Sequence, residues 1–389
     1  MGNFIDYLDW RGDLAFKIMP YNDVDGLLLS YLSYIDLKSI VPEVGKGEIS
    51  LKEAADKYFQ KWDLVDIEKD KSFVRLSPLI LKKMAETKRF RNAKLKSYVE
   101  VLTDETQFSA LEIITGDGVH FISYSGTDNS ITGWEEDFRF SYCYPECDSL
   151  GVKYLNDVAT KGRFEIRVGG HSKGGHLALY SSIFCNKKIR KRITEIHMFD
   201  GPGFYNKDLF SEPGYLEIKE RVKRTVPQGS VIGMLLNYDM KPTKYVKSVE
   251  TGIYQHDGFS WQVVSDDFEK CEKMSKPAKM FDDKINEWIN DISLEERKVM
   301  TKEIYEALKN AGIDQASELL AADITKIVGI LLGFSKSSKT SRKNIEKLIG
   351  IIISLWPQMI RAGRDEKNET KIIQKTIEAK LLKELYYKK

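Results

Sequence analysis

A serine framed by glycines stands near the middle of the chain, in Gly170-His-Ser-Lys-Gly174. Alternating apolar residues over 164–168 predict a strand before it, and residues 176–184 form a good helix sequence after it. A strand, a sharp turn and a helix are the context in which a G-x-S-x-G serine becomes an exposed nucleophile. We therefore predict that Ser172 is a catalytic nucleophile. The simpler alternative is a glycine-rich turn that holds an incidental serine.

A serine nucleophile needs a base, which is usually a histidine. The chain has five histidines, and four of them are poorly placed to reach the serine hydroxyl. His120 and His197 fall within predicted strands. His171 lies in the Gly170–Gly174 turn, which we call the elbow, and His176 lies on the predicted helix after it. His256 lies in a predicted loop after the later strands, where the chain order of hydrolase triads puts the base. Elimination favours His256, and the alternative is a solvated loop histidine.

An acid is needed between these two residues to orient the imidazole. Asp200 directly follows a predicted strand over 195–199 and starts the turn Asp200-Gly-Pro-Gly203. Asp239 lies in a loop after a second predicted strand over 231–236, and Asp208 lies in a less suitable polar stretch. We prefer Asp200 over Asp239. The alternative for Asp200 is a turn aspartate that caps its own loop.

Backbone N–H groups must stabilise the oxyanion that forms during acyl transfer. One is expected from Lys173, the residue after the nucleophile, at the start of the predicted helix, where the helix dipole helps. The other is expected from a loop at the end of an earlier strand. Ser125-Gly-Thr127 follows the predicted strand over 119–124, and its glycine lets the backbone come close. We predict Thr127 and Lys173 as the oxyanion-hole donors.

The motifs resemble two known families. Tyr124-Ser-Gly-Thr127 with Trp134 and Asp137, the elbow, and His256-x-Gly258 resemble fungal-type class 3 lipases. Further segments resemble the Mbeg1-like family, a bacterial domain of unknown function that is α/β-hydrolase-like: Tyr7–Asp13, Phe16, Asn22–Asp25, Leu32–Tyr34, Asp200–Phe204, Gln255–Asp257 and Ser260-Trp261. The resemblance covers about residues 3–265. It implies an α/β-hydrolase fold and a Ser-His-Asp triad, but it supplies no substrate.

Two positions depart from the class 3 lipase pattern. Ser230, in Val226-Pro-Gln-Gly-Ser230, stands where those lipases carry the triad aspartate. Either the acid has moved, as an assignment to Asp200 requires, or the triad is incomplete. Lys173 replaces a leucine of the lipase elbow, and its side chain either faces solvent or brings positive charge to the site.

The elements that must position these residues fall into three regions. Residues 1–20 are expected to be extended, and helices are expected over 20–95. From residue 95 to 265 strands alternate with helices after an antiparallel start, which predicts a mostly parallel α/β sheet with helices on both faces. Residues 1–265 thus form the predicted α/β-hydrolase domain. Residues 266–389 form a predicted helical accessory or lid region.

The composition of the chain limits the kinds of partner that it is expected to bind. The net charge of +2 gives no support for nucleic-acid binding, and the four cysteines show no metal-ligand spacing, so we predict no metal and no cofactor. No signal peptide is recognisable, and the longest uncharged apolar run, Leu348–Ile360, is too short to span a bilayer, which favours a cytoplasmic protein. Basic residues beside the apolar segments 324–334 and 345–360 suggest a peripheral membrane contact, although packing on the core is the preferred interpretation.

These observations favour a serine hydrolase that cleaves small-molecule or lipid esters. The alternative is an interaction or regulatory module that kept the fold and lost its triad, because a fold does not imply a function.

Overall fold

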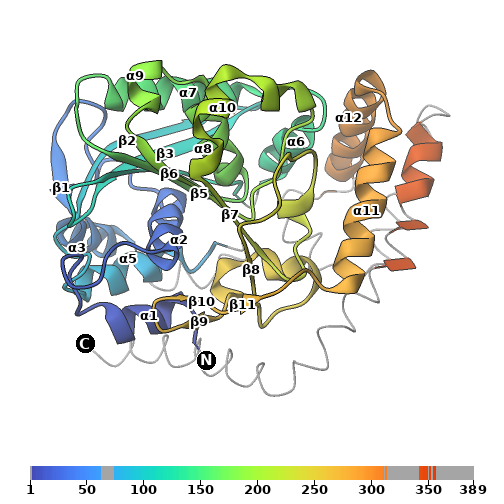
Figure 1. The fold of residues 1–389 in the computed structure, drawn as a ribbon. Helices are drawn as coiled ribbons and strands as arrows, with labels where there is room; N and C mark the ends of the chain where they lie inside the picture. The colour runs from blue at the N-terminus through green and yellow to red at the C-terminus, as the bar shows by residue number, and fades with distance from the viewer. Residues whose placement is uncertain are drawn as a thin grey trace.

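The computed structural model describes residues 2–62, 74–128, 130–310, 312, 341–348, 350–351 and 354–355. Within these ranges a nine-stranded sheet forms the centre of the molecule (Figure 1). Its strands, in spatial order, are β1 (Glu48–Ser50), β2 (Lys94–Leu102), β3 (Gln107–Ile114), β4 (His120–Tyr124), β5 (Ile166–His171), β6 (Ile193–Phe199), β7 (Val222–Pro227), β8 (Lys244–Val246) and β11 (Lys270–Cys271). A separate pair joins β9 (Val263–Val264) to β10 (Asp267–Phe268).

The sheet changes from antiparallel to parallel at β4. Strands β1 to β4 pair antiparallel, and β4 to β8 run parallel. In the parallel part Tyr124 lies opposite Gly170, and His171 lies opposite Phe199. The residues that follow β4, β5 and β6 therefore meet at one edge of the sheet, where open α/β sheets carry their sites.

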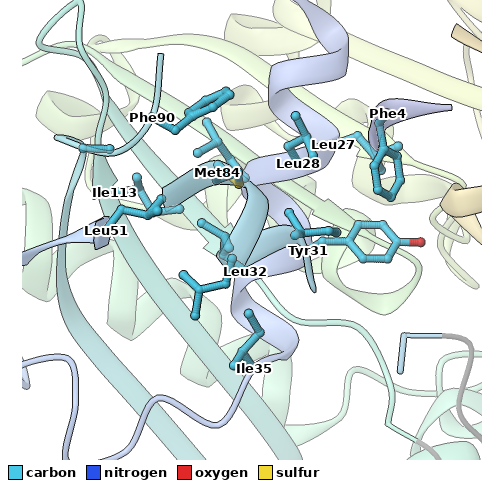
Figure 2. Packing of buried hydrophobic residues seen from close by; sticks show 14 of the residues in the cluster. Phe4, Leu27, Leu28, Tyr31, Leu32, Ile35, Leu51, Met84, Phe90 and Ile113 are labelled. Carbon is cyan, nitrogen blue, oxygen red and sulfur yellow. The ribbon is translucent and has the colours of Figure 1, made fainter. Parts of the chain in front are cut away.

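Helices cover both faces of the sheet, as the sequence predicts (Figure 1). One face carries α1 (Phe4–Arg11), α2 (Asp23–Tyr31), α3 (Leu51–Lys61) and α5 (Ser77–Glu86). Reciprocal capping boxes start α2 at Asn22 and α3 at Ser50. Figure 2 shows the core that these helices form, with Leu27 and Leu28 of α2, and Leu32 just after it, in one cluster with Leu51, Met84 and Ile113. The arrangement is that of an α/β-hydrolase-like fold.

The opposite face carries α7 (Glu146–Ala159), α8 (Lys173–Phe184), α9 (Lys187–Arg190) and α10 (Pro213–Ile218), and α6 (Ile131–Arg139) lies beside them (Figure 1). Helix α8 is buried nearly all round, including both residues that follow Ser172. A helix with little polar surface fits only between other elements. It packs between α7 and strands β5 and β6, which fixes the turn at its start.

A buried ion pair ties the N-terminal segments together. Arg89 binds Asp25 through its guanidinium, with Nε 2.8 Å from Oδ1, and donates to the carbonyl oxygens of Leu14 and Met19. Tyr7 donates to the same carboxylate over 2.8 Å. Burial raises the pKa of Asp25, against the opposing effect of Arg89. The Tyr7–Asp13 and Asn22–Asp25 motifs thus meet in a structural network.

Two predicted elements are wrong. Residues 1–20 include a helix, α1, because Asn3 and Asp6 form a capping box that the composition hides. Residues 231–236 form no strand, and Ile232–Met234 is a 3-10 helix. Their apolar side chains, including Met234 and Leu235, pack against the C-terminal helices instead of facing a sheet neighbour.

The C-terminal region begins with α11 (Lys276–Asn290) and α12 (Leu294–Asn310), which share a core with residues 231–235. Helix α12 packs against α6, where Arg297 donates to the carbonyl oxygen of Ser141 over 2.6 Å. Among the helices in the described ranges, none combines the length and the apolarity needed to span a membrane. The predicted membrane-contact segment 324–334 lies outside the described residues. Half of segment 345–360 is described, and there Ile345, Ile351 and Leu355 are buried in the core that α11 and α12 share. The domain division near residue 265 stays a prediction.

Candidate active site

The turn between β5 and α8 is strained at Ser172, which has a φ of 59° and a ψ of −132°. This left-handed φ is unusual for a non-glycine residue and marks functional sites. A Cβ on Gly170 would lie 2.2 Å from the Gly174 carbonyl carbon, and one on Gly174 would lie 2.1 Å from the Tyr124 carbonyl oxygen. Only glycines fit the turn, as the sequence predicts for a nucleophile elbow.

His256 and Asp200 lie in contact, although they are far apart in the chain. His256 ends the 3-10 helix Gly252–His256, and its Nδ1 lies 2.7 Å from Asp200 Oδ2. Asp200 follows β6 directly, is fully buried, and has a left-handed φ of 48°. A carboxylate accepts, so Nδ1 carries the proton and Nε2 keeps its lone pair. That is the tautomer in which a histidine can act as a base.

Ser230 supports the second oxygen of this carboxylate. Its hydroxyl donates to Asp200 Oδ1 over 2.5 Å. Gly233 allows the close approach, because a Cβ there would lie 2.1 Å from the same oxygen. Ser230, which stands at the position of the aspartate in the class 3 lipase pattern, follows β7, whereas Asp200 follows the neighbouring strand β6.

The other two candidate acids lie elsewhere. Asp239 is exposed and accepts a hydrogen bond from the hydroxyl of Tyr215. Asp208 is also exposed, in the 3-10 helix Lys207–Ser211. Asp200 is the one of the three that contacts His256.

His171 links the elbow to residues 252–260, which carry His256 and which we call the histidine loop. Its Nε2 donates to the carbonyl oxygen of His256 over 2.7 Å, and its Nδ1 accepts from the Tyr34 hydroxyl over 3.0 Å. The two imidazole rings lie 4.5 Å apart between centroids. Burial lowers the pKa of His171 well below its ordinary value, so the ring stays neutral. Ser172 and His256 are therefore held on adjacent segments.

The remaining histidines have structural partners. His120 lies 2.6 Å from Glu112, and His197 lies 2.9 Å from Glu195. His176 donates through Nδ1 to the Gly203 carbonyl oxygen over 2.9 Å. These contacts agree with the elimination that favours His256.

The histidine loop rests on the N-terminal helices. Gly258 N–H donates to the Tyr31 hydroxyl over 2.7 Å, and Asn3 Nδ2 donates to the Phe259 carbonyl oxygen over 3.1 Å. The Phe4 and Phe259 rings pack with centroids 4.5 Å apart. The N-terminus thus determines where the imidazole of His256 lies.

Asp257, beside His256, occupies an unfavourable place for a charge. Its Oδ1 accepts from Phe259 N–H over 2.9 Å. Burial nevertheless raises the pKa of Asp257 to about 7.

The predicted oxyanion loop passes over the elbow. A Cβ on Gly126 would lie 2.7 Å from the His171 carbonyl oxygen, so this close approach requires glycine. Thr127 donates its hydroxyl to Asp137 of α6 over 2.7 Å. Burial raises the pKa of Asp137 to about 6, against the opposing charge of Lys173. Gly126 thus lies against the residue before Ser172, and the predicted donor that follows it, Thr127, is tied to α6.

The Lys173 side chain does not face solvent. Its Nζ is buried, donates to Glu136 Oε2 over 2.7 Å, and donates to the Gln107 carbonyl oxygen over 2.8 Å. Burial alone would lower the pKa of Lys173, but the Glu136 carboxylate raises it above its ordinary value. The charge is therefore permanent at neutral pH.

Sequence reasoning missed several residues around the site. Glu136 and Gln107 carry no motif that would single them out. Asp137 and Ser230 were visible as positions of the lipase pattern, yet their contacts with Thr127 and Asp200 were not. Tyr34 lay in a quoted motif without an assigned role.

Comparisons with known proteins complete the description. A family model described as Mbeg1-like matches residues 84–306. Among solved structures, the crystal structure of M37 lipase is similar at 20% identity with a TM-score of 0.33, over 54% of this chain and 68% of that chain. A likeness of this TM-score supports no argument about activity. No curated protein matches the chain.

Proposed function

Because this chain belongs to the Mbeg1-like family and carries His256 against Asp200 beside the strained turn at Ser172, we propose that it is a serine hydrolase of carboxylic esters. The contact between His256 Nδ1 and Asp200 Oδ2 is the observation that carries the proposal. It holds the proton on Nδ1 and orients the ring, so that Nε2 is the nitrogen that can act as a base.

In the proposed reaction Ser172 Oγ attacks the ester carbonyl carbon while His256 Nε2 takes the hydroxyl proton. The tetrahedral intermediate collapses, the alcohol leaves with that proton, and an acyl-serine remains. Water then attacks the acyl-serine with His256 again as base, which releases the acid and restores Ser172. Asp200 holds the imidazole tautomer and stabilises the imidazolium that forms in each step.

The negative charge on the carbonyl oxygen requires donors that are already in place. We assign this role to the N–H groups of Thr127 and Lys173. Lys173 is the first residue of α8, and the first N–H groups of a helix have no partner within the helix. The helix dipole favours an anion at the same end.

We propose small-molecule or lipid esters as the substrates, a class that only the family resemblance suggests. A cytoplasmic location and a peripheral membrane contact through the C-terminal segments also remain predictions. The alternative, a module with a degraded site, depended on a missing acid. The Asp200–His256 contact weighs against it.

Labelling with a fluorophosphonate probe tests the proposal, because the probe phosphonylates an activated serine and releases fluoride. We expect the wild type to be labelled and S172A to be unlabelled. In D200N the labelling rate should fall by about four orders of magnitude, since the amide favours the wrong tautomer. The matched variant D239N should label like the wild type. A folded wild type that the probe does not label would contradict the proposal.

A further inference from the structure

The buried ammonium of Lys173 is an unusual neighbour for a serine nucleophile. The side chain is 1% exposed, and the Glu136 side chain that pairs with it is fully buried. Removing both charges from water costs free energy that their attraction seldom exceeds, and apolar residues of similar volume often stabilise a fold as well or better. The pair therefore calls for a role other than stability.

The contacts of this pair lead to the oxyanion loop through Gln107. The Gln107 carbonyl oxygen accepts from Lys173 Nζ over 2.8 Å, and its N–H donates to Glu136 Oε2 over 3.3 Å. Its side-chain Oε1 accepts from the N–H of Asp128 over 3.1 Å. Asp128 immediately follows Thr127, so the first residue of β3 connects the elbow lysine to the loop that carries the second oxyanion donor.

Helix α6 lies directly against the same loop. A Cβ on Gly133 would lie 2.6 Å from Thr127 Cγ2 and 2.7 Å from Gln107 Oε1. The next turn of α6 presents consecutive carboxylates, Glu136 toward Lys173 and Asp137 toward Thr127. One helix thus contacts both residues whose N–H groups are the predicted oxyanion donors.

We propose that Glu136 and the Lys173 ammonium are a positioning pair, which holds α6, Gln107 and the loop 125–128 in register with the elbow so that both oxyanion donors converge. This inference rests on the proposed function for its catalytic consequence. The pair also balances charge, because its ammonium offsets one of the two carboxylates that α6 brings to Lys173 and Thr127. Glu136 touches no reacting atom in this arrangement and acts through Lys173.

The test compares two double variants, each of which removes an ion pair that α6 makes. E136L/K173M replaces the positioning pair by apolar residues and leaves no single charge buried. The matched control E135L/R139M removes the neighbouring Glu135–Arg139 ion pair, 2.9 Å between Oε2 and Nη2, with the same change in charge. Both proteins are compared with the wild type by amide hydrogen exchange over residues 125–128 and by the rate of fluorophosphonate labelling.

We expect exchange over 125–128 to be about tenfold faster in E136L/K173M and labelling to be about 10- to 100-fold slower, somewhat less than the loss of a whole donor. In an ester assay kcat should fall with KM unchanged, which a general loss of packing would not produce. E135L/R139M should match the wild type in all three. Should E136L/K173M fail to fold, E136Q is measured in its place: the amide keeps the shape of Glu136 and removes the charge opposite Lys173, and the same changes in exchange and labelling are expected.

If amide exchange over 125–128 in E136L/K173M is as slow as in the wild type, the inference is wrong. It is also wrong if exchange is faster but the labelling rate is unchanged. If even the wild type is not labelled, the proposed function falls. Exchange over 125–128 then still decides whether Glu136 and Lys173 position the loop.

Discussion

Ser230 donates its hydroxyl to Asp200 Oδ1, on the side of the carboxylate opposite to the oxygen that faces His256. The carboxylate is fully buried and therefore depends on such donors. The residue that replaces the lipase aspartate thus supports an acid supplied by the neighbouring strand. The serine at position 230 therefore helps to hold the Asp200 carboxylate in place.

Removal of this hydroxyl should weaken both the fold and the site. For S230A we expect a loss of about 1.5–3 kcal/mol in the free energy of unfolding, the contribution of a hydrogen bond to a charged group. Labelling by the fluorophosphonate probe should slow by about tenfold, because Asp200 orients His256 less firmly. Urea denaturation and labelling kinetics measure the two effects. S149A, which removes an exposed hydroxyl on α7, is the control and should change neither.

The elbow glycines should not tolerate even a methyl group. In G174A the new Cβ would lie 2.1 Å from the Tyr124 carbonyl oxygen, a backbone atom that cannot swing away. We expect a loss of about 3 kcal/mol in unfolding free energy and loss of labelling. In G151A the nearest atom is 3.7 Å away, and an alanine within α7 should be neutral or stabilising by up to about 1 kcal/mol. Equal thermal midpoints for the two variants would contradict the steric argument.

The Arg89–Asp25 pair should matter for folding and not for chemistry. R89M leaves the Asp25 carboxylate buried without its cation and removes donors to three carbonyl groups. Breaking such a pair costs about 3–5 kcal/mol. Chemical denaturation should show this loss, whereas the folded fraction should be labelled at the wild-type rate. K52M removes an exposed i,i+4 pair and should cost at most about 0.5 kcal/mol.

Asp257 should make the fold less stable as the pH rises. Its pKa is about 7 in the folded protein and 3.8 as the ordinary value, so between these values the folded state binds a proton that the unfolded state has lost. The contribution of Asp257 to the free energy of unfolding is therefore greatest below pH 4. It decreases by about 1.4 kcal/mol per pH unit as the pH rises toward 7. D257N keeps an acceptor for Phe259 N–H and cannot ionise.

Urea denaturation of both proteins at pH 5, 6, 7 and 8 checks this expectation. The stability of D257N relative to the wild type should grow up to about pH 7 and stay constant above it. A constant difference over the whole range would show that Asp257 titrates normally.

The sequence was informative where chemistry restricts the choice of residue. The glycines around Ser172 are required by close backbone contacts, so the elbow could be located from its pattern. His256 could be found because few histidines competed. The Asp200 contact could only be ranked above Asp239, since both follow predicted strands and burial distinguishes them only in three dimensions.

Other features were hidden because they depend on partners distant in the chain. The apolar run over 231–236 predicts a strand, yet Val231, Met234 and Leu235 pack on helices that follow residue 275. The burial of Lys173 depends on Glu136 and Gln107, and neither residue signals this from its own segment. The starts of α2 and α3 depend on local capping by Asn22 and Ser50, which is why helices could be expected in this region.

The anchoring of the histidine loop on the N-terminal helices has a consequence for synthesis on the ribosome. The Asn3–Phe259 hydrogen bond joins residues that are 256 positions apart. The partner of the first helix is therefore synthesised only after nearly all of residues 1–265. Until then a nascent chain holds the elbow and the Asp200 turn without a docked imidazole. The proposed esterase activity should therefore begin only after the loop has left the exit tunnel, and an N-terminal fusion should disturb the position of His256.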